Sequence, residues 1–147
     1  MEAPKQSDLS FDAWPFYWLI RANVRYLDAL NSALEGTGLD PSSWRVIMVL
    51  AENHWLSVSE LASQANTKLS TMTKTVNRMK ADGLVTTREG TVDRRVTEVT
   101  TTAKGRALAP IANDAAQHVY TRAFGRMSES SAALLNELLS ELADNLR

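Results

Sequence analysis

The stretch "LASQANTKLSTMTKTVNRMKADGLV", residues 61–85, is typical of two short helices joined by a tight break. Ser57 and Glu60, just ahead of it, have the spacing of a capping box, in which each side chain can satisfy a free backbone amide of the other residue. The first helix is therefore expected to begin at Ser57 and to end before a break at Asn66–Thr67. This pattern predicts a helix-turn-helix unit.

The second helix of this unit is expected over Leu69–Ala81, and Gly83 stops it, as a glycine just past a helix end does. Its buried face has apolar residues at i, i+4 and i+7, namely Met72, Val76 and Met79. The opposite face carries Ser70, Thr71, Thr73, Lys74, Asn77 and Arg78. Such a helix enters the DNA major groove, where Lys74 and Arg78 can reach guanine edges or phosphates. An ordinary amphipathic helix with a solvated polar face would show the same pattern.

The next segment, "LVTTREGTVDRRVTEVTTT", residues 84–102, is rich in valine and threonine, and it predicts a two-stranded hairpin with its turn at Glu89–Gly90. Three arginines lie near the tip: Arg88, Arg94 and Arg95. Beside a groove-reading helix, such a tip lies over the minor groove, whose negative potential attracts arginine. Asp93 shares a strand face with Arg95 and can orient its guanidinium. A plain surface ion pair, worth under about 1 kcal/mol, is the alternative.

The charge distribution supports a polyanionic partner. Residues 68–106 hold nine cations and four anions, whereas the rest of the chain holds seven cations and thirteen anions. A basic middle between acidic flanks is typical of a module that binds nucleic acid, although accidental clustering on a solvated surface would look similar. The full set of candidate DNA-binding residues is Lys68, Ser70, Thr71, Thr73, Lys74, Asn77, Arg78, Arg88, Asp93, Arg94 and Arg95.

Helices are expected on both sides of this central unit, after a flexible arm at residues 1–12. Residues 15–35 and 103–127 show helical periodicity, with Gly105 and Pro110 weakening or bending the start of the second. Asp40 and Pro41 open a further helix. The last helix begins at Ser128 and carries one broad leucine face, formed by Leu134, Leu135, Leu138, Leu139, Leu142 and Leu146. The chain of 147 residues is thus expected to be one mainly α-helical domain with a small β-hairpin wing.

Several classes of protein are not supported by the sequence. The chain has no cysteine, so neither disulfides nor a thiol switch can form. His54 and His118 lie far apart without an acid cluster, and no metal or other cofactor is expected. No catalytic motif is present, so we do not expect an enzyme. The N-terminus lacks a signal-peptide pattern, and no apolar run could span a membrane, so we expect a cytoplasmic protein.

The residues resemble a known family over nearly the whole chain. Residues 61–85 are similar to the helix-turn-helix of the multiple antibiotic resistance regulator (MarR) family, and "DRRVTEVTTTAKG", residues 93–105, resembles its wing signature. "GLDPSSWRVIMVL", residues 38–50, looks like its second helix. Departures from the family pattern lie at Thr101, Asn66 and Lys68.

The resemblance implies a homodimer of winged helix-turn-helix subunits. Residues 13–36 and 103–147 would form the dimerisation helices, and residues 40–102 the DNA-binding lobe. The leucine face and "WPFYWLI", residues 14–20, carry more apolar surface than a helical monomer easily covers. Monomeric packing of the same residues is the alternative. A two-fold dimer predicts a pseudo-palindromic operator on double-stranded DNA, with half-sites roughly 34–36 Å apart.

The resemblance also implies a small-molecule effector that releases the DNA. Aromatic residues with nearby arginines suit a planar ligand with a carboxylate, so an aromatic acid or its thioester is expected. The candidate pocket residues are Phe16, Tyr17, Trp18, Arg21, Arg25, Trp44, Arg45 and His54. The same aromatic residues would equally suit a core or a dimer interface. The sequence therefore predicts a ligand-responsive transcription regulator, a repressor, with a winged-helix protein–protein interaction module that does not bind DNA as the alternative.

Overall fold

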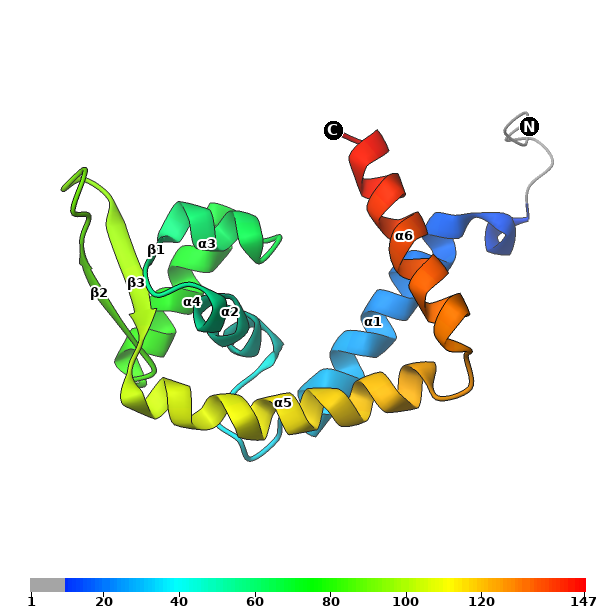
Figure 1. Ribbon diagram of the computed structural model, residues 1–147, viewed down its shortest axis with the longest axis horizontal. Helices are drawn as coiled ribbons and strands as arrows, with labels where there is room; N and C mark the ends of the chain where they lie inside the picture. Colours follow the sequence, from blue (N-terminus) through cyan, green and yellow to red (C-terminus); the bar gives the residue numbers. More distant parts are fainter. Residues whose placement is uncertain (1–9) are drawn as a thin grey trace.

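The computed structural model describes residues 10–147 and is mainly α-helical with one small sheet (Figure 1). Its elements, in chain order, are η2 (Phe11–Ala13), α1 (Pro15–Ala33), α2 (Pro41–Glu52), β1 (Leu56–Ser57), α3 (Val58–Gln64), α4 (Leu69–Ala81), β2 (Val85–Glu89), β3 (Thr97–Thr101), α5 (Ala103–Phe124) and α6 (Glu129–Asn145). The predicted fold class is confirmed. Most of the predicted arm, residues 1–9, lies outside the described residues, and its last residues take part in the short helix η2.

A side-chain cap and two residues with positive φ set the boundaries of the helices in the helix-turn-helix unit. The Ser57 hydroxyl accepts from the amide of Glu60 at 3.0 Å, and the Glu60 carboxylate accepts from the amide of Ser57 at 3.1 Å, so the predicted capping box is formed. Asn66 adopts a left-handed backbone with φ of 53° between α3 and α4. Asparagine tolerates this conformation better than most side chains. Gly83 follows α4 with φ of 74°.

The sheet has three antiparallel strands in the order β1-β3-β2. The predicted hairpin pairs Val85 with Thr101 and Glu89 with Thr97. The predicted turn at Glu89–Gly90 is wrong in its extent, because residues 90–96 form a longer loop, closed by a 2.7 Å hydrogen bond from Gly90 N to Val96 O. The sequence also missed β1, whose two residues are too few to show a period.

A single apolar core joins the lobe to the flanking helices. Leu61 of α3, Met79 of α4 and Val99 of β3 are almost fully buried. Leu30 from α1 and Ala112 from α5 complete the same cluster. The lobe is therefore packed onto the end of α1 and the first half of α5.

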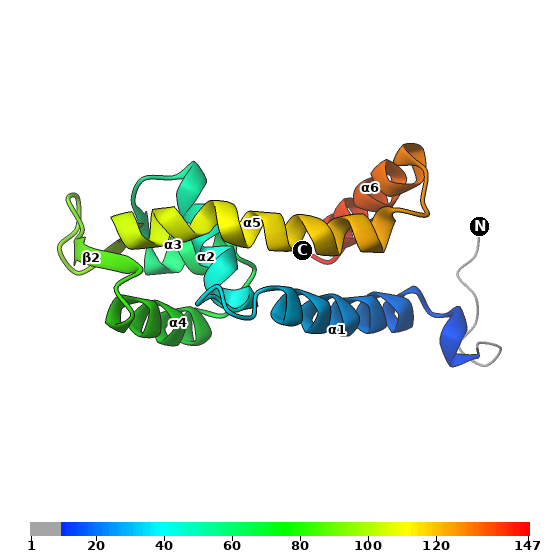
Figure 2. The ribbon, with the colours of Figure 1, turned by 90° about the horizontal axis from the view of Figure 1, so that it is seen from below.

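The helix α5 connects the lobe to the opposite end of the molecule. It runs uninterrupted from Ala103 to Phe124 although Pro110 lies inside it. It ends three residues earlier than the predicted Met127. Figure 1 shows the C-terminal end of α1 beside α5 and the rest of α1 rising away from it, with the lobe at the other end of α5. Figure 2 shows the two helices from below.

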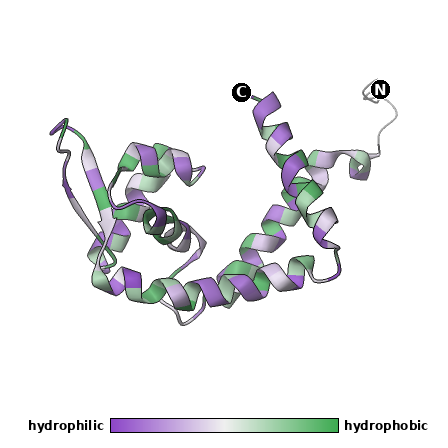
Figure 3. Cartoon of the chain, in the orientation of Figure 1, coloured by the Kyte–Doolittle hydropathy of each residue, from purple (hydrophilic) through white to green (hydrophobic). Residues whose placement is uncertain are grey.

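The last helix, α6, stands apart from the lobe in Figure 1. None of its residues, Glu129–Asn145, is buried within the chain. Its exposed apolar side chains are Leu134, Leu135, Leu138 and Leu139, with Leu146 just after the helix. Figure 3 shows apolar and polar residues alternating around this helix. An amphipathic helix of this kind has an apolar stripe that a single copy of the chain leaves uncovered.

Candidate nucleic-acid interface and effector pocket

The helix α4 presents the predicted polar face to solvent. Met72, Val76 and Met79 are buried against the lobe. Every predicted DNA-binding residue of this segment is exposed, namely Lys68, Ser70, Thr71, Thr73, Lys74, Asn77 and Arg78. The Thr73 hydroxyl donates to Leu69 O at 2.9 Å. The side chains that carry sequence-reading chemistry are thus accessible on one face of a rigid helix.

A groove of about 570 Å³ separates α4 from the wing. Its polar lining consists of Ser57, Ser59, Thr73, Asn77, Lys80, Thr87, Arg95 and Thr97. Lys80 Nζ donates to Thr87 Oγ1 at 2.8 Å and links the helix to strand β2. Hydroxyl groups, amides and cations are the groups that hold phosphate oxygens. The groove can therefore accept a nucleic-acid backbone beside the helix.

At the wing tip Asp93 and Arg95 form the predicted ion pair. Arg95 Nη2 lies 2.9 Å from Asp93 Oδ2, and Arg95 Nε donates to Asp93 Oδ1 at 3.1 Å. The reason given from the sequence is wrong, because these residues lie in a turn and not on one face of a strand. The backbone amide of Arg95 donates to Asp93 Oδ1 at 3.0 Å, which closes the turn.

The charge of this pair is directed outward. The hydrogen bonds from the Arg95 side chain and backbone lower the pKa of Asp93, and the bond to Asp93 raises the pKa of Arg95. Although it is held at its base, the Arg95 side chain is 91% exposed. A fixed and solvent-facing guanidinium is suited to a phosphate or to a narrow minor groove. Arg94 beside it is also exposed.

Besides Arg95, two predicted DNA-binding arginines are bound to carboxylates of the chain. Arg88 Nε lies 3.3 Å from Glu98 Oε1 on the paired strand, and its guanidinium lies 3.9 Å from the centre of the Trp55 ring. Arg78 pairs with Asp40 at the start of α2. The structure thus brings Arg95 and part of the α4 face to one groove, whereas Arg88 is held across the β2–β3 pair by Glu98 and Trp55.

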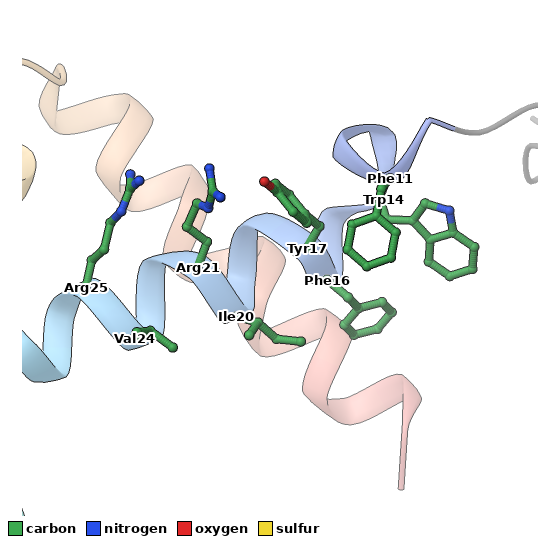
Figure 4. A pocket seen from close by; sticks show the side chains of 8 residues that line it. All are labelled: Phe11, Trp14, Phe16, Tyr17, Ile20, Arg21, Val24 and Arg25. Atoms are coloured by element: carbon green, nitrogen blue, oxygen red, sulfur yellow. The ribbon is translucent and has the colours of Figure 1, made fainter.

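The predicted effector residues separate into distinct places. Phe16, Tyr17, Arg21 and Arg25 line an open hollow of about 590 Å³ along α1, which Phe11, Trp14, Ile20 and Val24 complete (Figure 4). Arg21 lies over the rings of Tyr17 and Trp18, at 4.9 and 5.9 Å from their centres. All the lining residues come from η2, α1 and the residue that joins them, so this hollow is one exposed helix face and not an enclosed cavity.

Trp44 instead lines a second hollow, of about 390 Å³, between α1, α2 and α5. The other residues that line it are Tyr26, Met48, Asn113, Ala116, Gln117, Val119, Tyr120, Ala123 and Phe124. Trp44 Nε1 donates to Asn113 Oδ1 at 3.1 Å. The rings of Tyr120 and Phe124 lie 4.7 Å apart. Aromatic walls with a few polar groups are typical of a small-molecule site.

Arg45 and His54 lie in neither hollow. Arg45 Nη1 donates to Ala65 O at 3.2 Å and supports the end of α3. The carbonyl of His54 accepts a hydrogen bond from the Thr100 hydroxyl. The residues that α5 contributes to the second hollow were not predicted from the sequence. Tyr120 and Phe124, aromatic and one turn apart, were the available signal.

The described residues contain neither a metal-binding cluster nor a membrane-spanning helix. Across residues 10–147, no group of three or more His, Cys, Asp or Glu side chains is placed to hold a metal ion. Within the same residues, no helix combines the length and apolar character that crossing a membrane requires.

Comparison with known proteins identifies the family of this chain. The model of the MarR family matches residues 37–96, which include the helix-turn-helix. The HTH-type transcriptional repressor IacR of Pseudomonas putida is 36% identical over 143 residues, which cover 97% of this chain and 86% of that protein. The chain therefore belongs to the MarR family, as its motifs predicted.

Solved structures agree with this assignment. The structure of BpsR from Bordetella bronchiseptica, described with regulation of its DNA binding by 6-hydroxynicotinic acid, has a TM-score of 0.86 at 22% identity, over 92% of this chain and 97% of that one. The structure of NadR in complex with 4-hydroxyphenylacetate has a TM-score of 0.75 at 27% identity, over 96% of this chain and 98% of that one.

Proposed function

We propose that this protein is a transcription repressor that binds a pseudo-palindromic DNA operator as a homodimer and is released by a small aromatic effector. The observation that carries this proposal is the exposed polar face of α4 beside a wing whose Arg95 is held outward by Asp93. The similarity to a repressor over 97% of the chain supports the direction of regulation. We propose a cytoplasmic DNA-binding role without catalysis.

A homodimer explains the apolar surface that one copy leaves exposed. The helix α1 exposes Trp18, Ile20 and Val24, each by more than half of its accessible area. The helix α6 exposes Leu134, Leu135, Leu138 and Leu139 by 37–52% of their area. Exposed apolar surface of this kind on two helices is typical of a protein–protein interface. A second copy of the chain would cover both helices and set two α4 helices about one DNA turn apart.

The effector is proposed to bind in the hollow between α1, α2 and α5. Trp44, Tyr120 and Phe124 supply aromatic surface for a planar ring, and Asn113 and Gln117 supply hydrogen-bonding groups for its substituents. Two structural relatives are described with ring compounds that carry a carboxylate, 6-hydroxynicotinic acid and 4-hydroxyphenylacetate. An aromatic acid or its thioester is therefore the effector class that we propose for this chain.

Selection of bound genomic fragments by the purified protein would test the proposal. We expect recovery of an inverted-repeat sequence, and the affinity for that sequence should fall steeply as the salt concentration rises, because binding releases counterions from phosphates. A winged-helix module that binds only protein would retain no DNA, or would retain it without dependence on salt. Either result would remove the proposed function.

A further inference from the structure

The guanidinium of Arg78, near the end of α4, is bound by the first turn of α2. Arg78 Nη1 lies 2.8 Å from Asp40 Oδ2, and Nη2 donates to Asp40 Oδ1 at 3.2 Å. Two parallel bonds between a planar guanidinium and a carboxylate fix orientation as well as distance. Arg78 therefore differs from Lys74, its neighbour one turn earlier, for which the described residues provide no hydrogen-bond or ion-pair partner.

The carboxylate that binds Arg78 is itself fixed. Asp40 is the N-cap of α2, and its Oδ1 accepts from the amide and from the hydroxyl of Ser43, both at 2.9 Å. Burial raises the pKa of Asp40, but the bonds from Ser43 and Arg78 outweigh it, so that the pKa lies below its ordinary value. An ionised carboxylate that cannot rotate gives Arg78 a fixed anchor point.

The helix α2 holds the other helix of the unit as well. Arg45 Nη1 donates to the carbonyl of Ala65, the buried residue that ends α3. One guanidinium bond thus ties α2 to α3, and another ties α2 to α4. These contacts, one beside the turn of the helix-turn-helix and one near the end of α4, hold both of its helices against α2.

We propose that Arg78 is a positioning residue, which acts on DNA through Asp40 by setting the orientation of α4 and not by touching the duplex. The inference rests on the proposed function, since it concerns how that function reads its operator. The Arg78 side chain is held against the start of α2 and is 51% exposed, whereas that of Arg95 projects from the wing tip and is 91% exposed. On this account the effect of Arg78 lies in the accuracy with which Lys74 and Asn77 meet the bases.

The variant Asp40→Asn separates the two roles of Arg78, because asparagine keeps the cap on α2 but removes the charge that holds the guanidinium. If Arg78 positions α4, Asp40→Asn should bind the selected operator about fivefold more weakly than the wild type, the range of a half-exposed ion pair. Arg78→Ala should lose operator affinity by a similar factor. The double variant should lose no more affinity than the single variant that binds less tightly, because the two residues act through the same bond. Glu52→Gln removes an exposed acidic charge at the other end of α2, where no ion pair among residues 10–147 involves it, and should leave operator affinity unchanged.

The measurement is operator affinity against a scrambled duplex, at several salt concentrations, with melting temperature recorded for each variant. If Arg78 positions α4, Asp40→Asn should have a lower ratio of operator affinity to scrambled-duplex affinity and an unchanged salt dependence. Simple loss of folded protein would weaken binding to both duplexes alike and would leave that ratio unchanged. Arg78→Lys, which retains one of the two bonds, should recover part of the ratio. If Arg78→Ala does not fold, Asp40→Asn carries the test alone.

The opposite outcome is equally definite. If Arg78 contacts DNA, Arg78→Ala lowers the slope of log affinity against log salt concentration by about one, as Lys74→Ala should, because one phosphate contact is lost. An operator affinity of Asp40→Asn equal to or above that of the wild type would show that the bond to Asp40 does not position α4. Either result would overturn the inference while leaving the proposed function intact. Failure of the wild type to bind any DNA would overturn both.

Discussion

At the scale of single residues, the wing tip places an acid beside the cation that faces DNA. Asp93 holds Arg95 by two side-chain bonds and one backbone bond. Arg95→Ala should weaken operator binding about tenfold. It should also reduce the slope of log affinity against log salt concentration by about one, because a phosphate contact is lost. Asp93→Asn should also weaken binding although it removes a negative charge, since Arg95 loses its orientation. Both effects can be measured by titration of a labelled operator.

Glu89 provides the control for Asp93. It is an exposed acid at the end of β2, and no ion pair involves it among residues 10–147. Glu89→Gln should therefore bind the operator as tightly as the wild type or slightly more tightly. If Asp93→Asn behaves in the same way as Glu89→Gln, the carboxylate of Asp93 does not orient Arg95 in a way that matters for DNA.

Gly105, in the first turn of α5, is required by its contact with the backbone of the lobe. A Cβ atom on this residue would overlap the carbonyl oxygen of Leu84, which is held in place by the amide of Thr102 at 3.0 Å. Gly105→Ala should therefore destabilise the protein by about 1–3 kcal/mol through overpacking. Thermal unfolding at a fixed protein concentration would detect the loss, and Gly105→Ser should lose more. An unchanged melting temperature for both variants would contradict this reading.

At the scale of elements, two hollows are candidates for the effector site, and one tryptophan lines each of them. Trp44→Ala removes an aromatic wall and the hydrogen bond to Asn113 from the hollow between α1, α2 and α5. If the effector binds there, this variant should need at least about tenfold more effector for half-release of operator, the cost of a lost buried aromatic contact. The measurement is operator release by 4-hydroxyphenylacetate, 6-hydroxynicotinic acid and related aromatic acids.

Trp14→Ala is the matched variant in the hollow along α1, which Trp14 lines. It should leave the effector concentration for half-release unchanged. The reverse pattern, with release altered by Trp14→Ala and not by Trp44→Ala, would assign the effector to the hollow along α1.

The elements also show what could be predicted from the sequence and why. Helix ends were predictable because a cap such as Ser57 with Glu60 is closed by neighbours in the chain. The exposed face of α4 followed from the spacing of its buried residues. The strand β1 was missed because its pairing with β3 is made over a long separation in sequence. The second hollow was missed for the same reason, since tertiary packing alone brings Trp44 to Asn113.

At the scale of the whole molecule, the apolar stripe of α6 separates two ways in which the chain could exist. A monomer would leave Leu134, Leu135, Leu138 and Leu139 in water, exposed by 37–52% of their area. Burial of apolar surface is worth roughly 25 cal/mol per Å², so that a stripe of this length favours association with a second copy. The function that we propose requires that association, since one α4 helix reads only half of a palindromic operator.

A charge placed on either side of α6 tests the dimer directly. Leu138→Glu lies in the leucine stripe and should convert the protein to a monomer, because an unpaired carboxylate would be buried at the interface. The monomer should lose most of its operator affinity, since only one half-site can be held at a time. Ser140→Glu adds the same charge on the opposite side of the helix and should leave a dimer that binds normally. Sedimentation velocity and operator titration measure the two effects. If the wild-type protein sediments as a monomer, the proposed dimer does not form. If Leu138→Glu remains a dimer, the interface lies elsewhere on the chain. Either result removes the geometry that sets the two α4 helices one DNA turn apart.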